Sequence, residues 1–226
     1  MIKYVFFDLD DTLLDFKRAE RESIAATLDE FGLDSGEDTV KRYSEINDGL
    51  WKRLERGEFT REHLLSERFR ILLRELGSSV SARDMRDAYE GRLASSYFML
   101  EGAKEILDTI YTRYRLYIAS NGILQVQRKR IAGAGISRYF ENVFISEELG
   151  AEKPSELFFE RAFSKIPGFR KEHAIIIGDS LTSDIAGGAA AGIKTCYFNP
   201  KRKAHNASPT FEITRLSMLE TLLENL

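Results

Sequence analysis

The sequence predicts an α/β protein: a doubly wound, Rossmann-like parallel sheet with an all-α helical bundle inserted after the first strand. Two observations point to this class. Over most of the chain, short apolar runs alternate with helix-like stretches, which is typical of buried parallel strands joined by right-handed crossovers. By contrast, residues 16–99 contain no convincing strand and carry helical periodicity instead.

Five apolar runs are expected to form the sheet. Each is short and rich in β-branched or aromatic residues, as buried strands are. The runs are KYVFF (3–7), LYIAS (116–120), VFIS (143–146), AIIIG (174–178) and TCYF (195–198). Between them, the apolar spacing of AKEILDTIYTRY (103–114) and SELFFERAFSKI (155–166) predicts helices.

The stretch after the first strand is expected to be a separate helical unit. Ile24, Leu28 and Phe31 recur at i, i+4 and i+7, so they line one face of a helix. We therefore expect a discontinuous core interrupted by a helical cap domain. The expected boundaries are 1–15 and 100–226 for the core and 16–99 for the cap.

Composition narrows the functional class. Hydrophobic residues make up 43% and charged residues 31% of the chain, and the net charge is −3. An acidic balance argues against a nucleic-acid partner, and no apolar run is long enough for a membrane span. Cys196 is the only cysteine, so no intrachain disulfide can form and a cytoplasmic location is expected. The sequence does not indicate an oligomeric state.

Polar and charged residues follow the predicted strands. In open α/β sheets, ligands bind outside the carboxyl ends of the strands, so these residues are expected to converge on one rim. They are Asp8, Asp10 and Thr12 after the first strand, Ser120 and Asn121 after the second, Lys153 after the third, and Asp179 and Asp184 after the fourth.

This set of groups fits phosphoryl transfer through an aspartyl intermediate. A carboxylate can be the nucleophile if a cation such as Mg²⁺, which prefers oxygen ligands, offsets the charge of the phosphate. Ser120, the Asn121 backbone N–H and Lys153 are donors of the kind that a phosphate needs. Asp10 is the candidate for the second acid/base group, because in an extended chain its side chain would lie on the same side as that of Asp8.

The four segments resemble the motifs of the haloacid dehalogenase-like hydrolases, in the order expected for that superfamily. The matching segments are DLDDT, SNG, EKP and GDSLTSD. The resemblance implies that Asp8 is the nucleophile and Asp10 the general acid/base, the latter as in the phosphatases of the superfamily. It further implies Mg²⁺ bound by the Asp8 carboxylate, the Asp10 carbonyl and Asp179, with Asp184 supporting the metal's water shell or orienting Lys153. Ser120, Asn121 and Lys153 would hold the phosphate, with Thr12 bracing the first loop.

Two longer segments resemble the pyrimidine nucleoside 5′-monophosphate phosphatases within that superfamily. They are residues 50–73 and residues 121–154. The resemblance implies a small phosphomonoester substrate, most specifically a nucleoside 5′-monophosphate. A sugar-phosphate phosphatase or a phosphomutase would share the same core and remains an alternative. A non-enzymatic phospho-acceptor domain is a remote one, because its phosphorylated aspartate would follow a later strand.

Two nearby features are assigned no chemistry. Asp11 is expected to be a solvated or turn-forming residue. The small residues GGAAAG (187–192) lack the spacing of a nucleotide-binding glycine loop, and close packing of a helix on the sheet is the expected reason for them.

Overall fold

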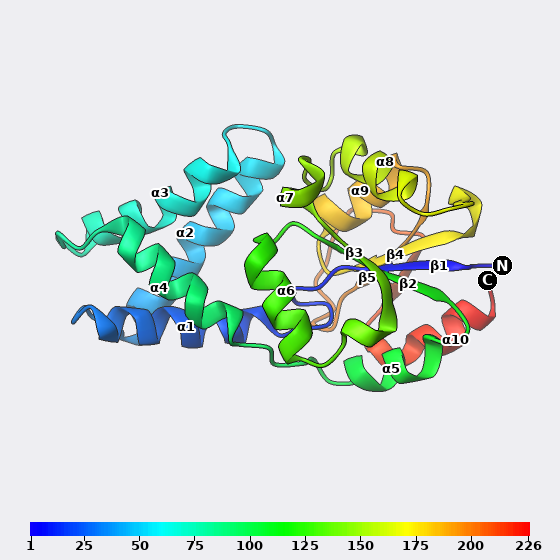
Figure 1. The fold of residues 1–226 in the computed structure, drawn as a ribbon, viewed down its shortest axis with the longest axis horizontal. Helices are drawn as coiled ribbons and strands as arrows, with labels where there is room; N and C mark the ends of the chain where they lie inside the picture. The colour runs from blue at the N-terminus through cyan, green and yellow to red at the C-terminus, as the bar shows by residue number, and fades with distance from the viewer. The chain divides into compact units, whose positions relative to one another are not determined.

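The computed structural model describes all 226 residues. Its sheet has six strands in the order β3-β2-β1-β4-β5-β6, and every neighbouring pair is parallel (Figure 1). The fold class predicted from the sequence is therefore confirmed. The strands are β1 (Tyr4–Phe7), β2 (Arg115–Ser120), β3 (Phe140–Ile145), β4 (Ala174–Gly178), β5 (Lys194–Phe198) and β6 (Phe211–Ile213).

The two edges of the sheet differ from the sequence-based expectation. β3 begins at Phe140 rather than at residue 143. Its early residues Glu141 and Asn142 are exposed, as an edge strand allows, so the apolar run that predicted the strand does not include them. β6 was not expected at all; its three residues pair with β5 through Cys196 and Phe211. Such a short edge strand carries almost no periodic signal.

Both faces of the sheet are buried under helices. Along β1, Val5 and Phe7 contribute to one apolar cluster with α5 (Ala103–Ile110) and α10 (Leu219–Glu224). Tyr4 and Phe6 alternate with them and contribute to the opposite cluster with α8 (Glu156–Ser164). Figure 1 shows α5 and α10 on one side of the sheet and α8 and α9 on the other. Burial of both faces explains why the central strands are uniformly apolar.

The remaining helical segments around the sheet are short. They are α6 (Leu124–Gly133), α7 (Ser146–Leu149), α9 (Ala186–Ala190), a π-helical turn at Leu181–Ile185 and single 3₁₀ turns at Ser137–Tyr139, Lys171–His173 and Leu216–Met218. A Cβ atom on Gly188 of α9 would lie 2.5 Å from Ile176 of β4. The expectation that the glycine-rich segment packs a helix closely on the sheet is therefore confirmed.

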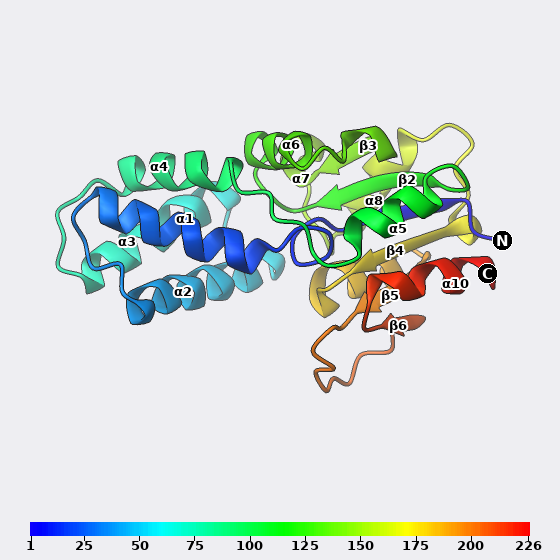
Figure 2. The ribbon, with the colours of Figure 1, turned by 90° about the horizontal axis from the view of Figure 1, so that it is seen from below.

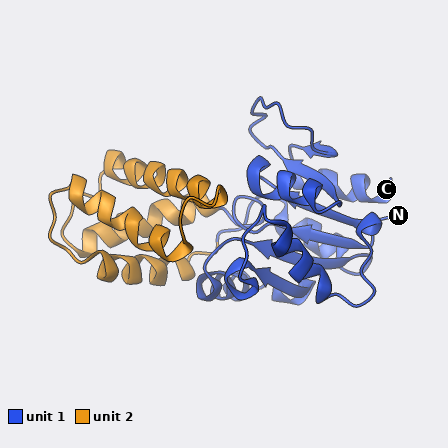
Figure 3. Ribbon diagram, turned by 90° about the horizontal axis from the view of Figure 1, so that it is seen from above, with its two compact units in different colours: residues 1–15, 98–226 blue, residues 16–97 orange.

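The helical stretch forms a second compact unit, which comprises residues 16–97, while residues 1–15 and 98–226 form the first (Figure 3). Its four helices are α1 (Phe16–Glu30), α2 (Glu37–Glu55), α3 (Arg61–Glu75) and α4 (Ala82–Ala94) (Figure 2). Tyr43, Phe69 and Tyr89 are fully buried and contact one another in tilted and edge-to-face arrangements, with ring centroids 5.3–5.5 Å apart. None of the helices of the chain is long and apolar enough to cross a membrane.

Candidate active site

Asp8 lies directly beyond β1, at the carboxyl edge of the sheet. Its backbone N–H donates to the carbonyl of Ile177, which continues the pairing of β1 with β4. One oxygen of the side chain accepts a hydrogen bond of 2.8 Å from Nζ of Lys153, and the other accepts one of 3.2 Å from the Thr12 hydroxyl. The Asp8 carboxylate is therefore held in one orientation by two donors.

The loop after Asp8 turns back on itself at once. The backbone N–H of Asp11 donates to the Leu14 carbonyl over 2.7 Å, and Asp11 has a φ of 56°. Aspartate tolerates this left-handed conformation better than most residues. Asp11 is thus turn-forming, as expected, and half-buried rather than fully solvated.

Lys153 is the central cation of the site. Its side chain is 1% exposed, and Nζ donates to Asp8 over 2.8 Å, to Asp184 over 2.6 Å and to the carbonyl of Ala119 over 2.6 Å. These three bonds match the three donors of an ammonium group. Burial alone would lower the pKa of Lys153, but the neighbouring charges of Asp184 and Asp8 raise it, so the side chain stays positively charged.

Asn121 fixes the loop that carries Lys153. Its amide nitrogen donates to the backbone carbonyl of Lys153, and its amide oxygen accepts from the Lys153 backbone N–H, both over 2.8 Å. The Asn121 side chain therefore joins the loop after β2 to the loop between α7 and α8. Its backbone N–H remains the part expected to contact a phosphate.

Asp184 is buried beneath the same site. It accepts from Lys153 and from the backbone N–H of Ser180. A Cβ on Gly178 would lie only 2.1 Å from an Asp184 oxygen, so the Asp184 carboxylate occupies the space that glycine leaves at the end of β4.

Three carboxylates meet at this edge. Oxygens of Asp8, Asp179 and Asp184 lie within 4.8 Å of one another. Burial raises the pKa of Asp8 to about 7, against the opposing charge of Lys153. Burial, with the charges of Asp8, Asp184 and Asp11, raises the pKa of Asp179 to about 9. One ammonium is too little positive charge for three acids, so this oxygen-rich set fits a divalent cation such as Mg²⁺.

Asp10 has different partners from Asp8. Its carboxylate accepts from Nε2 of Gln127 over 2.6 Å and from Nη1 of Arg130, both on α6. Ser120, at the end of β2, is buried, and its oxygen accepts from the same Gln127 amide over 2.9 Å. The candidate acid/base group and a candidate phosphate ligand thus share one neighbour.

Gln127 and Arg130 were not predicted from the sequence. Both point toward the protein interior, with Arg130 0% exposed, and they sit among the apolar positions Val126 and Ile131 on the buried face of α6. The sequence does contain a sign of their role: two long polar side chains occur at i and i+3 on an otherwise apolar helix face. Such residues are rarely buried without a polar partner.

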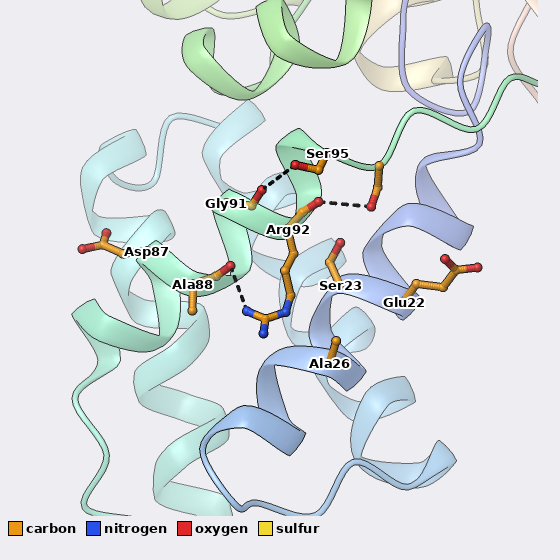
Figure 4. A pocket seen from close by; sticks show the side chains of 9 residues that line it. Glu22, Ser23, Ala26, Asp87, Ala88, Gly91, Arg92 and Ser95 are labelled. Carbon is orange, nitrogen blue, oxygen red and sulfur yellow. Dashed lines mark hydrogen bonds between the residues drawn. The ribbon is translucent and has the colours of Figure 1, made fainter. Parts of the chain in front are cut away.

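The helical unit has a groove of its own, with a volume of about 520 Å³, between α1 and α4 (Figure 4). Its only lining cation, Arg92, is paired with Glu30 over 2.6 Å and donates to the Ala88 carbonyl. No cluster of metal-binding carboxylates lies in this groove. The groove therefore lacks the groups that phosphoryl transfer requires.

Comparison with known proteins places the chain in a family. Residues 2–192 match the sequence profile of the haloacid dehalogenase-like hydrolases. The pyrimidine 5′-nucleotidase PynA of Streptococcus pneumoniae is 40% identical over 93% of this chain and 90% of its own. A glyceraldehyde 3-phosphate phosphatase of Methanopyrus kandleri is 28% identical over 95% of this chain and 94% of its own.

A solved structure matches over the whole length. The crystal structure of the HAD-hydrolase YfnB of Bacillus subtilis superimposes with a TM-score of 0.94 at 35% identity, covering 99% of both chains. That protein was crystallised with magnesium and shows interdomain movement. With the profile match, these similarities show that the chain is an enzyme of the haloacid dehalogenase-like hydrolase family.

Proposed function

We propose that this enzyme is a Mg²⁺-dependent phosphomonoester hydrolase that works through an aspartyl-phosphate intermediate. The observation that carries the proposal is the Asp8 carboxylate, held between Lys153 and Thr12 and beside Asp179 and Asp184. A carboxylate fixed in this way, next to a buried cation and a candidate metal site, has the arrangement that a phosphoryl acceptor needs.

In the first half-reaction an Asp8 oxygen attacks phosphorus. The bond between phosphorus and the ester oxygen breaks, and the leaving oxygen takes a proton from the Asp10 carboxyl group and departs as an alcohol. Ser120 and the backbone N–H of Asn121 donate to the non-bridging oxygens of the phosphoryl group, and Lys153 does so by exchanging its hydrogen bond to Asp8 for one to the transferred group. The products of this step are the free alcohol and phosphorylated Asp8.

In the second half-reaction water attacks the phosphorus of the aspartyl phosphate. Asp10, now a carboxylate, accepts a proton from that water. The bond from phosphorus to the Asp8 oxygen breaks, which releases inorganic phosphate and restores both carboxyl groups to their starting forms. When bound by Asp8, Asp179 and the Asp10 carbonyl, with Asp184 behind them, Mg²⁺ supplies positive charge that offsets the charges of the phosphate and the carboxylates.

The substrate proposed is a nucleoside 5′-monophosphate. We propose that residues 16–99 are the cap domain and that residues 1–15 and 100–226 are the catalytic core. The nucleotidase PynA, at 40% identity, is more similar to this chain than the glyceraldehyde 3-phosphate phosphatase, at 28%. A sugar-phosphate phosphatase is the second candidate, because such relatives share the whole length. The lone buried thiol of Cys196 suits an enzyme of the cytoplasm.

Replacement of Asp8 by asparagine tests the chemistry. Asp8→Asn keeps the shape of the side chain but removes the nucleophilic charge, so turnover of p-nitrophenyl phosphate should fall at least about 10³-fold. A variant that retains the circular dichroism of the wild type and its activity would disprove the mechanism. Asp108→Asn, an exposed carboxylate on α5 paired with Lys104, is the matched control and should keep its activity.

A substrate panel tests the specificity. Nucleoside 5′-monophosphates, deoxynucleotides, glyceraldehyde 3-phosphate and hexose phosphates would be compared by kcat/KM at saturating Mg²⁺. The highest value is expected for a pyrimidine nucleotide. A highest value for a sugar phosphate would replace the nucleotidase proposal by the second candidate and leave the phosphoryl-transfer mechanism intact.

A further inference from the structure

The Asp10 carboxylate is anchored by helix α6 rather than by its own loop. Nε2 of Gln127 donates to Oδ2 of Asp10 over 2.6 Å, and Nη1 of Arg130 donates to Oδ1. Asp10 is 27% exposed, whereas the Arg130 side chain is 0% exposed. Each oxygen of the proposed acid/base group is therefore held by a donor from α6, while the Asp10 side chain stays partly exposed.

The two anchoring side chains are also bound to each other. Nη1 of Arg130 donates to Oε1 of Gln127 over 3.0 Å, and Nε2 of Gln127 donates to the Ser120 hydroxyl over 2.9 Å. Gln127 thus connects the candidate proton donor to a candidate phosphate ligand. A rotation of its amide would disturb both contacts at once.

The loop after β2 is shaped to admit this glutamine. A Cβ on Gly122 would lie 2.3 Å from Nε2 of Gln127, well inside the contact distance of real Cβ atoms. The backbone N–H of Gly122 also donates to the Ser120 hydroxyl over 3.1 Å. Space therefore explains why a glycine follows Ser120 and Asn121, because any side chain there would displace the Gln127 amide.

A purely structural role would leave some of these features without a purpose. A buried arginine needs an acidic or carbonyl partner, and Asp10 satisfies that need. The need of Arg130 for a partner does not explain why Gln127 is a second donor to the same carboxylate, nor why Gln127 also binds Ser120. Each oxygen of a carboxylate has two lone pairs, so one donor on each oxygen leaves a position for the proton that is exchanged.

We propose that Gln127 and Arg130 are positioning residues that orient the Asp10 carboxyl group for proton transfer, with Gln127 tying that orientation to Ser120. The inference rests on the proposed function, since it assigns Asp10 the proton that the leaving oxygen receives. In the wild type the donors on α6 hold Asp10 in register with the scissile ester. Without them the carboxyl rotates, and the proton reaches the leaving oxygen less efficiently.

Leaving-group dependence separates positioning from general damage. The parameter kcat/KM covers the steps up to the departure of the leaving group. Proton donation matters little for 2,4-dinitrophenolate, which is stable as an anion, and matters much more for phenolate or an alkoxide. The variants are Gln127→Met, Arg130→Met and Gly122→Ala, and the substrates are 2,4-dinitrophenyl phosphate, phenyl phosphate and a nucleoside 5′-monophosphate. For Arg130→Met we expect losses of about 10- to 100-fold on the alkyl and phenyl esters, but less than about threefold on the dinitrophenyl ester. Gln127→Met and Gly122→Ala also disturb Ser120, so they should add a loss common to all three esters, and the alkyl and phenyl esters should still lose about 10-fold more than the dinitrophenyl ester.

Three controls sharpen the result. Arg128→Met removes an exposed arginine of the same helix that pairs with Glu148 over 2.9 Å, and it should match the wild type on all esters. Arg130→Lys keeps the charge and should recover part of the loss on the poor leaving groups. The affinity for Mg²⁺ measured by calorimetry should change less than about threefold in Gln127→Met, because Asp10 is proposed to bind metal through its backbone carbonyl.

The same variants in an Asp10→Asn background complete the experiment. If Gln127 and Arg130 act through Asp10, the extra loss on the poor leaving groups should disappear there, and only the loss common to all esters through Ser120 should remain. Equal losses on all three esters, or an unchanged extra loss on the poor leaving groups in the Asp10→Asn background, would overturn the inference. Gln127→Met and Gly122→Ala keep Arg130 in place and decide the matter if Arg130→Met does not fold. A wild type that hydrolyses none of the esters would instead overturn the proposed function, and this inference with it.

Discussion

Lys153 and Asp184 form an ion pair of 2.6 Å in which both side chains are only 1% exposed. Lys153 lies in the loop between α7 and α8, in the connection that follows β3, and Asp184 lies in the π-helical turn after β4. The same ammonium also holds Asp8, beyond β1, over 2.8 Å. One buried cation therefore ties three strand ends together, and both the stability of the site and its charge balance depend on that cation.

Replacing this cation should damage stability as well as activity. Lys153→Met fills a similar volume but leaves Asp8 and Asp184 without their counter-charge, so the free energy of unfolding should fall by about 3–5 kcal/mol. Turnover of p-nitrophenyl phosphate should be lost at the same time. Lys104→Met, on the exposed face of α5, is the control and should leave the free energy of unfolding close to that of the wild type. Wild-type stability in Lys153→Met, measured by urea denaturation, would contradict the buried-pair interpretation.

Metal binding should be visible as a change in stability. A cation at 100 times its dissociation constant stabilises the folded state by about 2.7 kcal/mol, so Mg²⁺ should raise the melting temperature and chelation by EDTA should lower it. Asp179→Asn removes one proposed ligand and a carboxyl group whose ionisation is disfavoured in the folded protein by burial and by the charges of Asp8 and Asp184, whereas the unfolded chain ionises it freely. In EDTA this variant should melt above the wild type, and Mg²⁺ should stabilise it less. An identical response to Mg²⁺ in both proteins would show that the ion binds elsewhere.

The sequence predicted the central part of the sheet and the groups at its edge for a physical reason. In a parallel sheet the carboxyl ends of all strands lie on one side, so residues far apart in the chain meet there. Assigning the strands was therefore enough to predict that Asp8, Lys153 and Asp184 lie close together. The structure places them in one hydrogen-bonded cluster.

The partners of Asp10 could not be predicted in the same way. Gln127 and Arg130 are 117 and 120 residues away in sequence, and they lie within a helix rather than at a strand end. Their contact with Asp10 depends on how α6 packs against the loop after β1, which no local pattern encodes. The short edge strand β6 was missed for a similar reason, since its pairing with β5 and not its own sequence defines it.

Gly178 should be intolerant of even one methyl group. A Cβ at this position would lie 2.1 Å from an Asp184 oxygen and 2.6 Å from the Asp184 Cβ, so the whole side chain of Asp184 and not only its tip would have to move. Gly178→Ala should therefore displace the carboxylate from Lys153, reduce kcat at least about tenfold and lower stability by about 1–3 kcal/mol. Gly49→Ala in α2 is a matched control, since nothing lies within 4 Å of that position, and it should be neutral or slightly stabilising. Equal behaviour of the two alanine variants would refute the packing argument.

The helical unit contains a buried carboxyl group of its own. Glu20 on α1 is 3% exposed and accepts hydrogen bonds from Ser44 over 2.7 Å and from Asn47 over 2.8 Å. Burial raises the pKa of Glu20 from its ordinary value of 4.5 to about 7; the nearby charge of Asp48 adds to this, and the hydrogen bonds and Arg68 oppose it. The folded protein therefore retains this proton at pH values where the unfolded chain has lost it.

The stability of the protein should consequently fall between pH 4.5 and 7. The contribution of protonated Glu20 is complete below pH 4.5 and is lost as the pH rises through about 7, which amounts to about 3 kcal/mol. Glu20→Gln cannot ionise and can still accept from Asn47, so its unfolding free energy should lack this component when measured by denaturant titration from pH 4.5 to 8. Glu22→Gln removes an exposed carboxylate of the same helix and should retain the wild-type pH profile. A Glu20→Gln profile parallel to that of the wild type would show that Glu20 titrates normally in the folded protein.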